Sequence, residues 1–244
     1  MLTQVFRAFF MSLGMFTAIP CPYRPWDEDA RGLMLAMLPV VGAVVGLLWF
    51  ALEELGSWLI PQVHSALVAA LPWLLTGFIH LDGFMDTCDA MLSWRPLEKR
   101  LEILKDSHTG AFAVVGLALL ALFSYDAANS RMVDMRPLIF IPIVSRCGSA
   151  FSVLSLRPIG HSQYAAMNGK GVQRLAVVAM WIVAVGCCAL WLGRPAFALL
   201  IETAVYAAAM TWVYRALRGV SGDLAGFALT VSECAALIAL YRFQ

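Results

Sequence analysis

Seven stretches of apolar residues, most of them about 20 residues long, set the first limit on how this chain can fold. They cover roughly residues 32–52, 59–80, 110–128, 137–156, 175–193, 195–214 and 224–241. A helix needs about 20 such residues to cross a bilayer. Only 14% of the 244 residues are charged, which is too few for a water-exposed surface. The sequence therefore predicts an all-α fold, a polytopic integral membrane bundle of about seven transmembrane helices in a single domain, residues 1–244.

The remaining segments are short or polar. The N-terminal stretch near 5–20 carries Arg7, so we expect an interfacial or re-entrant helix and not a removable signal peptide. Residues 82–109 should be a soluble segment that contains an amphipathic helix, with Leu97, Leu101 and Leu104 along one stripe; residues 157–174 are rich in Gly and Asn and indicate a loop. The six cysteines form no CxxC pair, and we expect neither a disulfide framework nor a thiolate zinc site.

Lys and Arg are distributed unequally between the two sides of such a bundle. Twelve of the seventeen fall in alternate segments that share one side, four fall on the other side, and Arg146 lies inside a span. Basic segments stay in the cytoplasm, so we expect the cell inner membrane, with the lipid bilayer around the chain and the N-terminus in the cytoplasm. The net charge of +1 gives no case for a nucleic-acid partner. Whether the chain forms a homo-oligomer stays open.

The segment GFIHLDGFMDTCDAML, residues 77–92, gathers three carboxylates in apolar surroundings. At about 100° per residue, Asp82, Asp86 and Asp89 would share one narrow face of a helix. Like charges repel at this spacing, and no Lys or Arg occurs between Arg31 and Arg95. A divalent cation with oxygen ligands would offset the charge, and Mg²⁺ bridging carboxylates to substrate phosphates fits best. We therefore predict a metal site and active site that face the cytoplasm.

Two alternative roles for these carboxylates stay open. In one, Asp82 caps the start of a helix, Asp86 faces solvent and only Asp89 matters. In the other, the acids line a pathway for cations or protons. His80 would lie nearly opposite the aspartates on a continuous helix, and it would reach them only if the chain bends at Asp82–Gly83.

Two segments on the same side carry residues suited to phosphate. In KDSHTGAF, residues 105–112, Lys105 is a point charge, Asp106 is a second acid for a metal or a proton, and Ser107 lies between them and the next span. A surface Lys–Asp pair at the end of a helix accounts for the same residues equally well. The loop GVSGD, residues 219–223, contributes Gly222 and Asp223, and its backbone N–H groups can approach a phosphate closely.

Charged residues also occur inside the predicted spans, where an isolated charge is costly. We expect Arg146 to pair with a phosphate or an acidic partner, and Glu233 to complete the site from the last span. Glu202 stands alone, and we interpret it as structural. His64 and His161 are interpreted as loop or core histidines.

Several of these motifs together resemble the cobalamin synthase family, adenosylcobinamide-GDP ribazoletransferase. They are HLDGFMDTCDAM, RLEILKDSHTGAFAV, Ser145–Arg146, and GVSGD followed by Glu233, and their order and spacing agree along most of the chain, from FTAIPCP onward. The family pattern reads HLDGLADTADG, then KDSRIGTFG, then GG-I/V-TGD. This chain departs from it at Cys88, Ala90, His108 and Arg218, and its FTAIP lacks the arginine common in that N-terminal motif. None of the changes removes a carboxylate, although the change at 108 removes one candidate phosphate contact.

The resemblance implies a transferase that joins adenosylcobinamide-GDP to α-ribazole, or to its 5′-phosphate, forms adenosylcobalamin or its phosphate, and releases GMP. It implies Mg²⁺ as cofactor, held by Asp82, Asp86 and Asp89, and these three with Asp106 as candidate catalytic residues. The candidate substrate-binding residues are then His80, Lys105, Ser107, Arg146, Gly222, Asp223 and Glu233. Two alternatives remain: a membrane enzyme like the CDP-alcohol phosphotransferases, although DGFMDT is not followed by their Ala-Arg, and an acid-lined cation or proton transporter.

Overall fold

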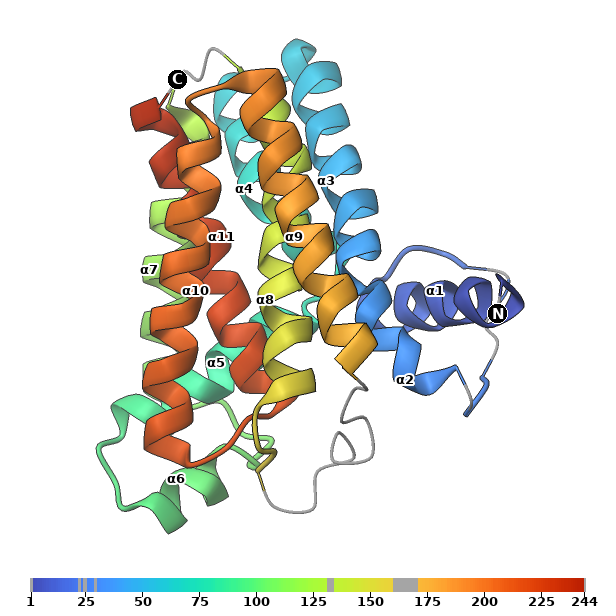
Figure 1. The fold of residues 1–244 in the computed structure, drawn as a ribbon. Coiled ribbons are helices and arrows are strands. Elements are labelled where there is room, and N and C mark those ends of the chain that lie inside the picture. Colours follow the sequence, from blue (N-terminus) through green and yellow to red (C-terminus); the bar gives the residue numbers. More distant parts are fainter. Residues whose placement is uncertain are drawn as a thin grey trace.

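A computed structural model of the chain is a bundle of long helices with the N-terminal helix projecting from one side (Figure 1). The structure describes residues 2–21, 23, 26–28, 30–130, 134–159 and 171–243. His161 and most of the predicted loop 157–174 lie outside these ranges. Within them, the only β-structure is an isolated bridge between Pro158 and Val220, so the predicted all-α class is confirmed.

Six segments are long and apolar enough to cross a membrane, in agreement with six of the seven predicted spans. The first, Arg31–Leu55, consists of α2 (Arg31–Met34), η1 (Leu35–Met37) and α3 (Leu38–Leu55), and the third, Arg136–Ser155, of η3 (Arg136–Ile139) and α8 (Ile141–Ser155). The other four are α7 (Ala111–Asn129), α9 (Gly171–Leu192), α10 (Ala196–Leu217) and α11 (Gly222–Phe243). Their first residues differ from the predicted ones by at most four positions, because apolar content alone does not mark where a helix begins.

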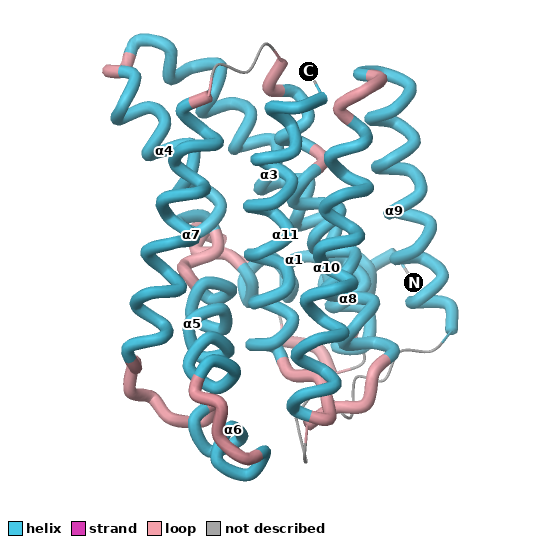
Figure 2. Tube along the Cα trace, turned by 90° about the vertical axis from the view of Figure 1, so that its left-hand side faces the viewer, coloured by secondary structure: helices cyan, strands magenta, loops and turns pink. Residues whose placement is uncertain are grey.

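The seventh predicted span, 59–80, is a broken helix. After η2 (Gly56–Trp58), α4 (Pro61–Leu75) and α5 (Ile79–Leu92) meet at a bend of 91°, as in a broken span or a re-entrant loop. Gly77 and Phe78 between them have φ angles of 58° and 63°, and left-handed residues of this kind end helices. The prediction of one continuous span was therefore wrong. The helix α5, which contains the start of the predicted soluble segment 82–109, lies between α7 and α11 (Figure 2).

The backbone groups released by this break find partners within the protein. The carbonyls of Trp73 and Leu74 accept the N–H groups of Phe78 and Gly77 at 2.9 and 3.1 Å, and the carbonyl of Leu75 accepts the N–H of Ala18 at 2.8 Å. An unsatisfied backbone group in hydrocarbon costs several kcal/mol. The break is tolerated because the turn at Gly77 and Phe78 and the segment that follows α1 (Leu2–Phe16) satisfy these carbonyls.

The helix α1 runs roughly perpendicular to the long helices (Figure 1). Its Val5, Phe6 and Met15 are exposed, whereas Ala8 and Met11 are buried against the bundle. An amphipathic helix in this orientation is typical of the membrane interface, which agrees with the interfacial form of the prediction.

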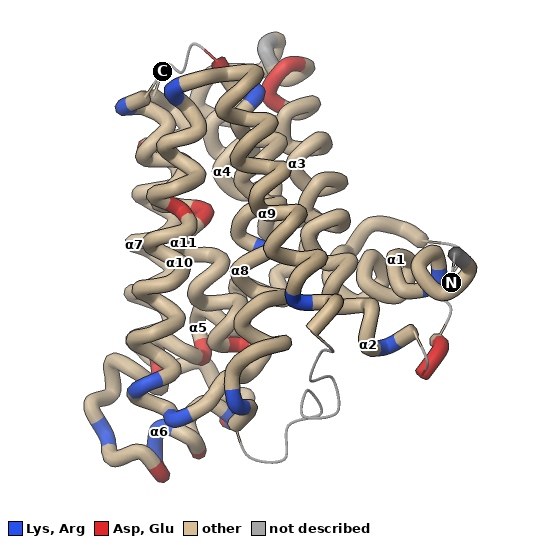
Figure 3. The backbone as a smooth tube through the Cα atoms, viewed as in Figure 1, with Lys and Arg blue, Asp and Glu red and all other residues tan. Residues whose placement is uncertain are grey.

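Basic residues gather at one end of the bundle, around α6 (Leu97–Ile103) and the nearby ends of α8 and α10 (Figure 3). Fewer lie at the opposite end. Within α6 the predicted apolar stripe is present, because Leu97 and Leu101 are half-buried and Leu104, just after the helix, is buried. The basic end is the one we predict to face the cytoplasm.

Close helix packing at a glycine gives a first test of the fold. A Cβ atom at Gly46 of α3 would overlap the backbone of Ile139 in η3, whereas a Cβ at Gly186 of α9 would meet nothing within 4 Å. We predict that Gly46→Ala lowers the free energy of unfolding by about 1–3 kcal/mol and that Gly186→Ala does not lower it. Thermal unfolding in detergent, followed by circular dichroism, measures both. Equal midpoints for the two variants would contradict this packing.

Candidate active site

Carboxylates of α5 lie beside the first turn of α11, at the basic end of the bundle. The two helices touch at Gly83, where a Cβ would lie 2.6 Å from the Cα of Asp223. Asp82 is exposed and Asp86 is half-buried, and the negative charges of Asp82, Asp89 and Asp223 all act on Asp86. Among the described residues none of these four acids forms an ion pair with a basic side chain. We call Asp82, Asp86 and Asp223 the acid site.

The helix that carries the acids is continuous, as their spacing predicts. α5 runs from Ile79 to Leu92 without interruption, so Asp82, Asp86 and Asp89 share one face. Asp82 lies in the first turn of α5, but the N-cap residue is Phe78, which makes no side-chain capping bond. The alternative in which Asp82 is only a helix cap is therefore wrong.

Asp89 has a contact that separates it from the other two aspartates. It is 8% exposed, and its carboxylate accepts hydrogen bonds from the N–H groups of Gly110 at 2.6 Å and Ala113 at 2.9 Å. These groups form the N-terminus of α7, which attracts negative charge. Asp89 thus joins α5 to the start of α7, a structural role that its local sequence does not reveal.

The described residues contain no group of three or more His, Cys, Asp or Glu side chains close enough to hold a metal ion by themselves. One reason is that Asp89 is directed toward the start of α7. The acid site still offers carboxylate oxygens, the ligands of Mg²⁺, and this ion commonly uses only one or two carboxylates together with substrate phosphates. The donor chemistry therefore fits a metal that arrives with a phosphorylated substrate, and the Mg²⁺ site stays a prediction.

Hydrogen bonds hold the loop GVSGD both to the segment that follows α8 and to the start of α11. Val220 donates to the carbonyl of Arg157 and accepts from Ile159, both at 2.9 Å, so the loop is joined to the chain that leaves α8. The hydroxyl of Ser221 accepts the N–H of Leu224 at 3.3 Å and so caps α11. These bonds hold the start of α11, Gly222 and Asp223, against α5.

The segment that follows α6 contains Lys105, Asp106 and Ser107. It ends at Gly110, whose N–H donates to Asp89, the aspartate next to the acid site. Lys105 and Ser107 are exposed. Asp106 does not form the surface pair with Lys105 that the sequence allows; its Oδ1 lies 2.6 Å from Nδ1 of His108 and accepts the His108 N–H at 3.0 Å. None of these contacts reaches the acid site, so a part for Asp106 in the chemistry stays a prediction.

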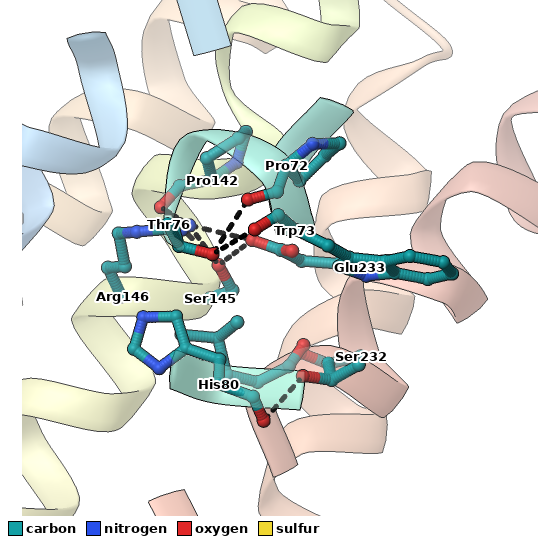
Figure 4. Close-up of polar contacts among 11 residues, drawn as sticks. Pro72, Trp73, Thr76, His80, Pro142, Ser145, Arg146, Ser232 and Glu233 are labelled. Carbon is teal, nitrogen blue, oxygen red and sulfur yellow. Dashed lines mark hydrogen bonds and ion pairs between the residues drawn. The ribbon is translucent and has the colours of Figure 1, made fainter. Parts of the chain in front are cut away.

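Arg146 and Glu233 pair with each other inside the bundle (Figure 4). Nη1 of Arg146 lies 2.7 Å from Oε1 of Glu233, and Arg146 is 1% exposed. Ser145 donates to the same Glu233 oxygen at 2.7 Å. The acidic partner expected for Arg146 is thus Glu233. Glu233 lies ten residues beyond Asp223 on α11, about 15 Å along the helix, so the structure does not bring this pair to the acid site.

His80 lies on the side of α5 that faces this buried pair (Figure 4). It is 8% exposed and stacks on Phe16 with ring centroids 6.3 Å apart. The condition for His80 to meet the aspartates, a bend at Asp82–Gly83, is not fulfilled, because the bend precedes the helix. His64 contacts Glu53 at 3.2 Å and belongs to neither group.

Comparisons with known proteins agree with these motifs. Residues 8–241 match the family described as cobalamin-5-phosphate synthase. An adenosylcobinamide-GDP ribazoletransferase of Clostridium botulinum is 36% identical over 249 residues, covering 98% of this chain and 99% of the relative. Proteins of the same name from Clostridium perfringens and Geotalea daltonii are 34% identical, covering 96% of this chain and 97% of the relative, and 31% identical, covering 96% of each. No solved structure matches the chain.

The capping role of Asp89 can be tested directly. We predict that Asp89→Ala destabilises the protein by about 0.5–2 kcal/mol and speeds hydrogen exchange at the N–H groups of Gly110 and Ala113, because both lose their acceptor. Asp82→Ala is the matched control, since Asp82 is exposed and caps no helix. Hydrogen-exchange mass spectrometry of the protein in detergent measures both. Unchanged exchange at the start of α7 in Asp89→Ala would contradict the capping role.

The contact between Asp106 and His108 predicts a pH dependence. The hydrogen bond and the charge of Asp106 raise the pKa of His108 above its ordinary 6.5, and the same contact lowers the pKa of Asp106. The contact favours the charged form of His108. Its contribution to the free energy of unfolding is therefore complete below the ordinary histidine pKa and is lost as pH rises through the raised pKa.

We therefore expect Asp106→Asn to lower the pKa of His108, as measured by NMR titration of its ring proton. The signal is assigned by its loss in His108→Gln. A titration curve that does not move in Asp106→Asn would show that the contact does not set this pKa.

Proposed function

The chain belongs to the cobalamin-5-phosphate synthase family, and we propose that it joins adenosylcobinamide-GDP to α-ribazole or α-ribazole 5′-phosphate. The products are adenosylcobalamin or its 5′-phosphate, and GMP. The membership supports a role in the final step of cobalamin synthesis, and the names of the relatives supply the two substrates.

The observation that carries the proposal at the level of residues is the acid site. Gly83 brings α5 against the backbone of Asp223 in α11, and the charges of Asp82 and Asp223 both act on Asp86. A chain of this composition gathers acids without basic partners at a cost. A positively charged ligand that arrives with a diphosphate would remove that cost.

The reaction forms one phosphorus–oxygen bond and breaks another. A ribazole hydroxyl attacks the phosphorus attached to cobinamide, the bond from that phosphorus to the bridging oxygen breaks, and GMP leaves with the electron pair. The hydroxyl proton needs an acceptor close to the attacked phosphorus. We assign this part to Asp86, which is half-buried at the centre of the acids, since Asp89 is bonded to α7 and Asp106 to His108.

Mg²⁺, when bound, would supply positive charge to the diphosphate. Asp82, Asp86 and Asp223 are the residues that would hold it. Lys105 and the other basic side chains at this end of the bundle would attract the substrate phosphates and the departing GMP. We place this end in the cytoplasm of a cell whose inner membrane holds the bundle, because the basic residues gather there (Figure 3).

The family membership favours the ribazole transfer over the CDP-alcohol phosphotransferase and cation-transporter alternatives. The acids lie at one end of the bundle and not in a row across it, as a transport pathway would require. In the interior, the buried Glu233 is already paired with Arg146.

The purified full chain in detergent, given adenosylcobinamide-GDP, α-ribazole and Mg²⁺, should release GMP. We predict that Asp86→Asn lowers kcat by about 100-fold or more, because the proton acceptor and a metal ligand are lost, while Asp126→Asn has wild-type activity. Asp126 is an exposed aspartate of α7, near its far end from Gly110. Absence of GMP release by the wild type would end the proposed function. Full activity of Asp86→Asn would end the site assignment and leave the function standing.

A further inference from the structure

A cavity of about 410 Å³ lies between α8, α9 and α10. Its walls are mostly apolar, and they include Phe151, Val177 and Trp181. The helices α9 and α10 are joined at the end of the bundle opposite the basic end, and they separate toward the basic end, where α8 is visible between them (Figure 1). All three helices belong to segments that are apolar enough to cross a membrane. The cavity therefore lies within the depth of the bilayer.

The cavity is open on the side of the surrounding lipid. Among the residues that line it, Phe151 of α8, Val178 of α9, and Ala207 and Thr211 of α10 are exposed. An exposed side chain in the membrane-spanning part of such a bundle faces hydrocarbon and not water. A molecule that enters the cavity between α9 and α10 therefore comes from the bilayer.

Two polar groups of the wall already have partners within the protein. The indole of Trp181 donates a hydrogen bond to Thr203 at 3.0 Å, and the hydroxyl of Tyr206 donates to Ser152 at 3.3 Å. An occupant rich in polar groups would meet mostly apolar walls and would lose its hydrogen bonds to water. A hydrocarbon chain has no such loss.

Glu202, a further polar residue of the wall, belongs to the buried charged group at mid-bundle. It is 0% exposed, and the charges of Arg146 and Glu233 act on it. Nε and Nη2 of Arg146 and both carboxyl oxygens of Glu202 have no hydrogen-bond partner among the described residues. These donors and acceptors are complementary to one another, so Glu202 does not require a polar ligand from the bilayer.

The cavity continues along α10 into an open groove that carries a positive charge. Ala207 and Thr211 line both spaces, and the groove adds Trp212 and Arg215. Arg215 is exposed and forms no ion pair with an acid in the described part of the chain. It lies two residues before the end of α10, at the basic end of the bundle. Basic and tryptophan side chains at such a position are typical of the level of the lipid headgroups.

We propose that the cavity and the groove form a binding site for one anionic phospholipid, with an acyl chain in the cavity and the phosphate at Arg215. Ala207 lies eight residues from Arg215, about 12 Å along the helix. An acyl chain extends over about 15 Å, half the thickness of the hydrocarbon core. A phospholipid with its phosphate at Arg215 can therefore pass Ala207 and fill the cavity.

The basic end of the bundle favours an anionic headgroup over a zwitterionic one, because each Lys or Arg near the surface attracts negative charge. An acyl chain would also keep water away from the buried group of Glu202, Arg146 and Glu233, and attraction between charges is stronger where water is excluded. This site is independent of the chemistry proposed for the acid site.

A second copy of this chain fits the opening less well. A helix is about 10 Å wide, so one turn of it has about the volume of the whole cavity and would not pass between the walls. An acyl chain is much narrower, and the same phospholipid molecule supplies the anion for Arg215.

Two alanines of α10 give a matched test of the acyl-chain position. Ala204 and Ala207 are both exposed, but only Ala207 lines the cavity and the groove. Delipidated full chain in detergent is titrated with phosphatidylglycerol, and native mass spectrometry counts the bound lipids. Wild type and Ala204→Phe should bind one molecule saturably. Ala207→Phe should bind it about tenfold more weakly, because the ring takes up space of the chain.

Two arginines at opposite ends of the helix pair test the phosphate contact. Arg215→Gln should weaken phosphatidylglycerol binding by about fivefold, and phosphatidylcholine should bind the wild type more weakly than phosphatidylglycerol does. Arg194→Gln is the matched control, because Arg194 is an exposed arginine between α9 and α10 that lines neither space.

Thermal unfolding gives a second measurement. Saturating phosphatidylglycerol should raise the unfolding midpoint of the wild type by about 5 °C and that of Ala207→Phe by less. If Ala207→Phe does not yield monodisperse protein, the arginine pair decides.

Three outcomes would overturn the inference. The first is equal phosphatidylglycerol affinity in Ala207→Phe and Ala204→Phe. The second is equal binding of phosphatidylglycerol and phosphatidylcholine together with an unchanged affinity in Arg215→Gln. The third is a wild-type dimer that binds no lipid and that Ala207→Phe dissociates, which would assign the opening to a second copy of the chain.

Discussion

The arrangement of the bundle depends on one broken helix, whose freed backbone carbonyls must find hydrogen-bond partners in apolar surroundings. Within a membrane, a helix can end only where the freed carbonyls find other partners. Here the N–H groups of Gly77, Phe78 and Ala18 supply them, and the left-handed Gly77 and Phe78 turn the chain by 91°. The turn lays α5 between α7 and α11. Without it, the aspartates would continue along the line of α4 and would not meet the start of α11.

The two sides of α5 have different electrostatic surroundings, and this difference organises the interior. One side carries Asp82 and Asp86, which have access to water and to ligands. The other carries His80 toward the pair of Arg146 and Glu233, which are almost completely buried. A buried ion pair is costly to break, since either partner would be left as an uncompensated charge. The pair therefore links α8 to α11 at mid-bundle, while the acids at the end of the bundle stay available for chemistry.

Sequence reasoning succeeded where a residue's role follows from its chemical type and spacing. The three aspartates share one helix face, α6 has its apolar stripe, and Arg146 has an acidic partner. It failed where the role depends on what another segment places nearby. Asp89 could not be separated from Asp82 and Asp86, because its two hydrogen bonds come from Gly110 and Ala113, more than twenty residues away.

The sequence by itself determined that the chain is helical and apolar enough to cross a membrane about seven times, and that acids and basic residues gather near one end. These properties follow from hydrophobicity and helical periodicity, which are local. Only the tertiary structure decided which acids meet, because Gly83 brings Asp223 against α5 from 140 residues further along the chain. It also decided that Arg146 is paired with Glu233 inside the bundle. A side chain's partner depends on the path of the whole backbone, and a single sequence does not contain that path in readable form.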